Sequence, residues 1–211
     1  MLYRQSWPPP GARAAPNRNN LSCPVGNFYT NVTVRGAAQP AIIEVLRELG
    51  RRAIVTPAVN GFTTVCDKES ESQDQHIVGS VALTLSARLQ CPAWAILNHD
   101  DDVLWYQLYD RGQLADEYIS SAMWWDAESG PPPRGSAESL CHVMGAPGDP
   151  KRVQRILRRS SGIFGYLFAI NRHSDLVKAL GMPLYSVGSG HKYLSRGDLP
   201  EGLTAEDLAR I

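Results

Sequence analysis

The sequence predicts an α+β protein whose core follows the ferredoxin-like order βαββαβ. Segments that alternate apolar and polar residues are interleaved, up to about residue 121, with segments of helical periodicity. Two turn signals, Asn60-Gly61 and Asp110-Arg111-Gly112, join neighbouring β-rich segments as hairpins. We therefore expect a ferredoxin-like domain over 26–121, extended by an antiparallel hairpin, and a mainly helical subregion over 122–211 packed on it.

The first half of this core begins with a strand over 27–34, where aromatic and β-branched residues dominate. A helix follows, with Pro40 in its first turn, an apolar face at i, i+4 and i+7, and Gly50 at its end. The segments 51–59 and 62–67 then form the first hairpin. Pro57 cannot donate a backbone hydrogen bond, which indicates an edge or a bulge for the first of these strands.

The second half begins with a helix whose apolar face repeats every 3.6 residues from Val78 to Leu89. Ser72 and Gln75 fit a capping box at its start. The continuous apolar segment 92–98 indicates a central strand, and 103–109 and 113–120 indicate the extending hairpin. Both helices are expected on one face of the sheet.

The C-terminal part predicts helices rather than a second sheet. Ser136 and Asp149 are placed to cap helices that begin at 137 and 150, and Gly145 ends the first of them. A third helix is expected from about Phe164 to Leu180, although 162–170 also fits a strand. The segments 184–188 and 191–194 resemble short strands, and a terminal helix is expected from Thr204.

Composition narrows the classes of function. The 211 residues contain 21 basic and 21 acidic side chains, so the basic excess typical of nucleic-acid-binding proteins is missing. No apolar segment approaches the ~20 residues that span a bilayer. Residues 1–25 are rich in Pro, Asn and Arg, without the apolar segment of a secretory signal, and we expect a disordered leader. The four cysteines form no CxxC pair and no disulfide pattern, which together with the missing signal indicates a reducing compartment. We therefore expect a cytoplasmic protein without a cofactor.

The most conspicuous polar cluster is His99 followed by Asp100, Asp101 and Asp102, between two predicted strands. Carboxylate oxygens and imidazole are metal ligands, so Asp100, Asp102 and His99 are candidates for a metal site. The spacing favours a solvated turn, because adjacent residues of an extended chain point in opposite directions. Neither the histidines nor the Gly188–Gly190 segment matches an established metal or phosphate-binding motif.

Two further features indicate an interaction surface. Trp124 and Trp125 are adjacent in a predicted loop, where both cannot easily be buried, and tryptophan is enriched at binding hot spots. They are the candidate partner-binding residues, and the alternative is that they dock onto the protein's own sheet. The predicted basic helix over 151–159 could contact phosphates or an acidic partner, although a solvated helix face is the usual role of such a segment.

Three segments, GNFYTNVTVRG at 26–36, LNHDDDVLWYQLY at 97–109 and RHSDLVKALGMP with YLSRGDLPEGL near the C-terminus, resemble an uncharacterised family of bacterial proteins. The similarity covers about residues 26–203. It implies a bacterial origin and an ordered region that begins near residue 26, and it implies no activity.

Two functional hypotheses remain open from the sequence. The first is a non-enzymatic interaction or regulatory protein that binds a protein partner or self-associates, with neither a membrane nor a nucleic acid as its partner. The second is a metal-assisted hydrolase that uses the cluster from His99 to Asp102. Metal binding by the aspartates is the observation that separates the two hypotheses.

Overall fold

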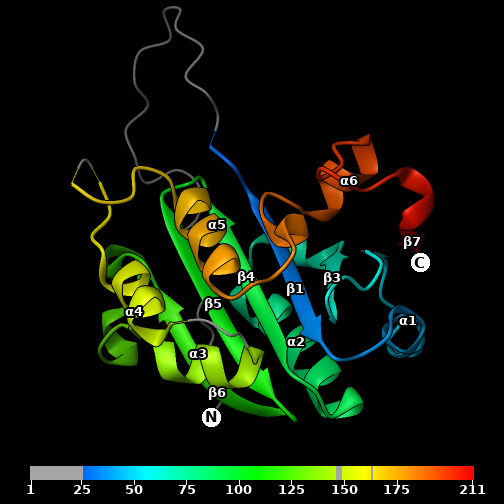
Figure 1. The fold of residues 1–211 in the computed structure, drawn as a ribbon, viewed down its shortest axis with the longest axis horizontal. Helices are drawn as coiled ribbons and strands as arrows, with labels where there is room; N and C mark the ends of the chain where they lie inside the picture. The colour runs from blue at the N-terminus through cyan, green and yellow to red at the C-terminus, as the bar shows by residue number, and fades with distance from the viewer. Residues whose placement is uncertain (1–25, 146–148, 163) are drawn as a thin grey trace, which may run out of the picture.

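The protein is a seven-stranded antiparallel sheet with helices on both faces (Figure 1). The computed structural model describes residues 26–145, 149–162 and 164–211. The elements of the first part are β1 (Tyr29–Arg35), α1 (Gln39–Glu48), β2 (Ala53–Val55), β3 (Phe62–Asp67), η1 (Glu69–Ser72), α2 (Gln75–Leu89), β4 (Ala93–His99), β5 (Val103–Asp110) and β6 (Gln113–Ile119). The second part contains η2 (Ala122–Trp124), η3 (Ala127–Ser129), α3 (Ala137–Met144), α4 (Pro150–Arg158), α5 (Ala169–Ala179), η4 (Leu184–Ser186), α6 (His191–Arg196), η5 (Ala205–Asp207) and β7 (Ala209–Arg210).

The strand order across the sheet is β6-β5-β4-β1-β3-β2-β7. Both predicted hairpins form, and their central residues take the positive φ angles that a tight hairpin turn requires: 52° and 80° at Asn60 and Gly61, and 48° and 76° at Arg111 and Gly112. The short strand β7, which sequence periodicity did not indicate, pairs with β2 and completes the sheet at the opposite edge from β6.

Helices α1 and α2 cover one face of the sheet, as their apolar spacing predicts. Ile42, Leu46, Val78 and Leu85 are buried in the same cluster as Val32 of β1. The start of α2 differs from the prediction. Asp74, and not Ser72, is the N-cap residue, and its carboxylate accepts from the backbone N–H of His76. Ser72 belongs instead to η1.

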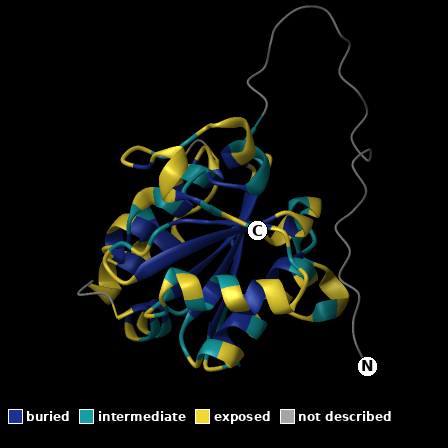
Figure 2. Ribbon diagram, turned by 90° about the vertical axis from the view of Figure 1, so that its right-hand side faces the viewer, coloured by how far each residue is buried: buried dark blue, intermediate teal, exposed yellow. Residues whose placement is uncertain are grey.

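Helices α3, α4 and α5 cover the opposite face and share a second buried cluster with the sheet. Figure 2 shows the strands as a buried layer between helices whose outer surfaces are exposed. Tyr29, Trp94 and Tyr106 project from alternate strand positions into this cluster and meet Leu140 of α3 and Leu176 of α5. Residues beyond 121 therefore pack on the sheet.

Several expectations for the C-terminal part are wrong. The segments 184–188 and 191–194 contain η4 and the start of α6 rather than strands. Helix α5 begins at Ala169 rather than near Phe164. Only a 3-10 turn follows Thr204, before β7. Short apolar segments between glycines fit several conformations, and packing against the sheet decides among them.

The expected leader over 1–25 lies outside the described residues. Within the described part of the chain, no helix is both long and apolar enough to cross a membrane.

Candidate functional site

The aspartate run forms the tight turn between β4 and β5 at one end of the sheet. Asp100 and Asp101 both adopt left-handed backbone conformations, with φ angles of 52° and 54°. This turn directs Asp101 inward, where 8% of its surface is exposed, while Asp100 and Asp102 are exposed. The three carboxylates therefore do not face a common point.

Asp101 holds three segments together. Its carboxylate accepts hydrogen bonds from the Asn27 side chain (2.7 Å), the Asn98 side chain (2.9 Å) and the backbone N–H of Ile170 (3.3 Å). Its carbonyl accepts from the N–H of Ala169 at 2.7 Å. A carboxylate at the N-terminus of α5 is stabilised by the free amides and the helix dipole. Asp101 is thus a structural residue that joins the entry to β1 with the end of β4 and the start of α5.

His99 points to the other side of the turn, toward the face covered by α1 and α2. Its ring lies 5.0 Å from those of Phe28 and Trp124, and its Nδ1 is 3.2 Å from Oε1 of Gln73. Burial lowers the pKa of His99, although the charges of Asp100 and Asp102 act in the opposite direction. The imidazole therefore packs against two aromatic rings.

The candidate metal set of Asp100, Asp102 and His99 is not assembled. Across residues 26–145, 149–162 and 164–211, no three His, Cys, Asp or Glu side chains are grouped so that they could hold a metal ion. The physical reason is the turn itself, which buries the middle aspartate away from its two exposed neighbours.

A buried polar network lies under α5. His173 is fully buried; its Nδ1 is 2.8 Å from the Tyr29 hydroxyl and its Nε2 is 3.5 Å from Oγ of Ser186. Burial lowers the pKa of His173 to about 3, so the ring is neutral at physiological pH. Ser186 is itself only 1% exposed, so neither residue presents a reactive atom to a substrate.

A small pocket opens beside the N-terminus of α5. It has a volume of about 140 Å³ and is lined by Asp101, Asp102, Ser120, Ser161, Gly162, Tyr166, Leu167, Ala169 and Arg172. Arg172 is 1% exposed and donates to the backbone carbonyls of Ile156 (2.6 Å) and Arg159 (2.7 Å) at the end of α4. Its guanidinium lies 4.5 Å from the Tyr166 ring centroid. Arg172 therefore fixes the end of α4 against α5.

The segment after β6 carries the two candidate partner-binding tryptophans. Trp124 and Trp125 are half-buried against the α1–α2 face of the sheet, whereas Met123 beside them is 90% exposed. The Trp125 indole donates to the Gly130 carbonyl at 3.1 Å. We call Met123, Trp124 and Trp125 the tryptophan patch. Exposed Asp100 follows His99 directly in the chain, and the His99 ring lies 5.0 Å from that of Trp124, so the acidic turn lies at the border of the patch.

No protein-family model, no curated protein and no solved structure matches this chain.

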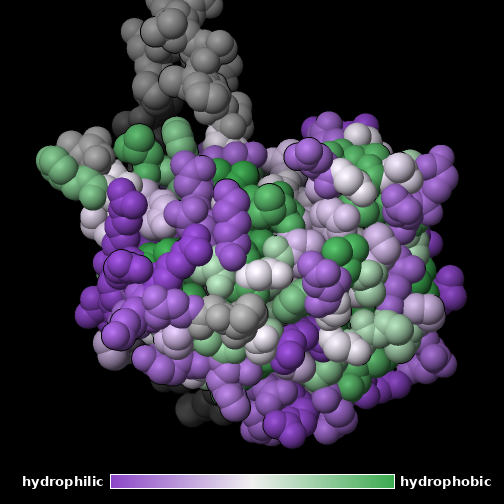
Figure 3. Space-filling model, viewed as in Figure 1, coloured by the Kyte–Doolittle hydropathy of each residue, from purple (hydrophilic) through white to green (hydrophobic). Residues whose placement is uncertain are grey.

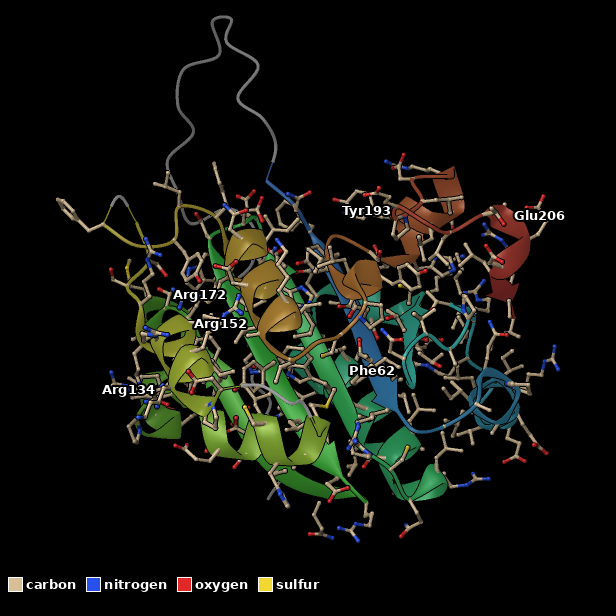
Figure 4. All side chains as sticks on the ribbon, viewed as in Figure 1. Phe62, Arg134, Arg152, Arg172, Tyr193 and Glu206 are labelled. Atoms are coloured by element: carbon tan, nitrogen blue, oxygen red, sulfur yellow. The ribbon has the colours of Figure 1, made fainter. Side chains whose placement is uncertain are left out.

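The other prominent surface lies on the α3–α5 side. Hydrophilic side chains gather over α4 in Figure 3, and Figure 4 places Arg134, Arg152 and Arg172 on that side of the molecule. The basic helix is evident from the sequence. The structural roles of Arg172 and Asp101 are not, because their main partners come from other elements of the fold and leave no local sequence signal.

Proposed function

We propose that this chain is a non-catalytic interaction protein of the bacterial cytosol that acts by docking a protein partner on the tryptophan patch. We also propose that a ferredoxin-like core is formed by β1, α1, β2, β3, α2 and β4. The inner strand order β4-β1-β3-β2 and the placement of α1 and α2 on one face support this classification.

The observation that carries the proposed function is the exposure of apolar side chains after β6. Met123 is 90% exposed, and the two tryptophans that follow it are half-buried against the sheet. Large, rigid aromatic side chains that are anchored on one edge and open on the other are typical of binding hot spots. Since Asp100 and Asp102 border the patch, we expect the partner to present apolar side chains accompanied by basic ones. A second copy of the chain is one such partner.

Site-specific photo-crosslinking tests this proposal. A benzoylphenylalanine replaces Met123, and a matched control carries it at Leu49, which is 41% exposed at the end of α1. We expect one discrete covalent adduct from position 123 in cells of the source organism, and none from position 49. The adduct must then be reproduced with the purified partner and weakened at least about tenfold by Trp124→Ala. Absence of any adduct from position 123 would refute the proposal.

A further inference from the structure

The outward surface of α4 carries a concentrated positive charge. Five cations, all exposed, lie on this helix or directly after it: Lys151, Arg152, Arg155, Arg158 and Arg159. Among the described residues, none of the five forms an ion pair with a carboxylate. The other residues of the chain contain 16 basic and 21 acidic side chains, so the zero net charge conceals a segregated positive surface. Val153, Ile156 and Leu157 fill the buried side of the helix and fix the orientation of this surface.

An exposed apolar loop adjoins these cations. Phe164, Leu167 and Phe168 are 89%, 61% and 50% exposed, respectively. The loop is closed by the pairing of Ser161 with Tyr166 and by a hydrogen bond from the Gly162 N–H to the Tyr166 carbonyl at 2.8 Å.

The loop is also tied to the basic helix. The guanidinium groups of Arg159 and Arg172 lie 5.1 Å and 4.5 Å from the Tyr166 ring centroid. Tyr166, within the loop, is therefore held against Arg159 at the end of the basic helix. We call the five cations together with Phe164, Leu167 and Phe168 the basic–apolar surface.

We propose that the basic–apolar surface binds peripherally to a lipid bilayer that contains anionic lipids. Arginine and lysine are attracted by the negative surface of such a bilayer, and exposed Phe and Leu side chains gain free energy when they leave water for its interfacial region. Stable peripheral attachment requires two such signals together, and this surface supplies both. The phosphates of a nucleic acid would pair with the cations, but a phosphate backbone has no apolar surface on which Leu167 could pack.

This contact goes beyond the proposed protein–protein function and uses different residues. It also departs from the sequence-based expectation of no membrane partner, which rested on the absence of a spanning segment. The cations of α4 and the tryptophan patch lie on opposite faces of the sheet, whereas the apolar loop adjoins the end of β6, where Ser161 donates to the Ser120 carbonyl.

Vesicle flotation of the full chain tests the proposal. The probes are vesicles of phosphatidylcholine alone and vesicles in which one third of the lipid is phosphatidylglycerol. The charge variant is Lys151→Gln/Arg152→Gln/Arg155→Gln, and the loop variant is Phe164→Ser/Phe168→Ser. The charge control removes three exposed cations outside α4, with Arg47→Gln/Arg52→Gln/Lys68→Gln, and the apolar control removes one exposed apolar side chain, with Leu49→Ser. Circular dichroism confirms that each variant is folded.

We expect the wild-type chain to float with anionic vesicles and not with neutral ones, and to be released by high salt. The charge variant should lower the partition coefficient by about 100-fold, and the loop variant by at least about 30-fold, while both controls stay within about threefold. Inorganic phosphate should release the protein no better than sodium chloride of equal ionic strength.

Three results would overturn the proposal. Failure to float with anionic vesicles is the first, and equal flotation with neutral vesicles is the second. The third is binding to anionic vesicles that the charge and loop variants leave unchanged. Binding to RNA without binding to either vesicle would assign the positive surface to another polyanion. None of these results affects crosslinking from position 123, so the two proposals fail separately.

Discussion

Acidification of the medium tests the buried network under α5. His173 has an ordinary pKa of 6.5 when unfolded, and burial lowers it to about 3 in the folded protein. Between these two values the unfolded chain binds a proton that the folded chain does not, so stability falls as pH falls. From pH 7.5 to pH 5 the loss from this residue is about 2 kcal/mol, since the pH is then about 1.5 units below the unfolded pKa and each unit corresponds to ~1.36 kcal/mol.

The assay is urea unfolding at pH 7.5 and pH 5, followed by tryptophan fluorescence, for the wild type and for His173→Gln. The glutamine retains hydrogen bonding toward Tyr29 but cannot take up a proton. We expect the pH-dependent loss of unfolding free energy to be about 2 kcal/mol smaller in the variant, whatever its absolute stability. His142→Gln, at an exposed position of α3, is the control and should match the wild type. Equal pH dependence in wild type and His173→Gln would refute the reasoning.

Three further predictions follow from buried and exposed charges. Asp101→Ala should lower the unfolding free energy by about 3 kcal/mol in urea denaturation, because the hydrogen bonds from Asn27, Asn98 and the start of α5 lose their acceptor. A loss below about 1 kcal/mol would show that the turn does not hold these segments. Arg172→Met should cost about 3 kcal/mol in the same assay, because the carbonyls at the end of α4 lose their donor, and a cost no larger than that of an exposed arginine would contradict it. Millimolar Mg²⁺, Ca²⁺, Mn²⁺ or Zn²⁺ should leave the Tm unchanged; a shift that disappears in Asp100→Asn/Asp102→Asn would restore the metal hypothesis.

The sequence predicts the sheet well where local chemistry decides the structure. Asn60-Gly61 and Arg111-Gly112 require positive φ angles, and both turns form. The helix start at Pro150 follows from the cap residue Asp149, whose carboxylate accepts the N–H of Lys151 at 2.9 Å. At these positions a few neighbouring residues determine the local backbone structure.

The candidate site was harder to predict, because its causes are not local. Asp101 reads as one of three solvated aspartates, and only the fold places α5 against it. Arg172 has no local sequence signal that predicts its burial, although its guanidinium is buried against carbonyls of α4. Short apolar patterns predict strands at 184–188 and 191–194, while contacts with β1 and β2 favour helical turns there. Trp124 and Trp125 could be placed in a loop, but not on a particular face of the sheet.

The proposed function requires that a protein docks on the tryptophan patch. Hydrogen–deuterium exchange of the full chain, alone and in complex with the partner captured from position 123, tests this docking. We expect slower exchange in the complex for the amides of residues 121–130, with α4 unchanged. Unchanged exchange over 121–130, with protection confined to other elements, would contradict the claim.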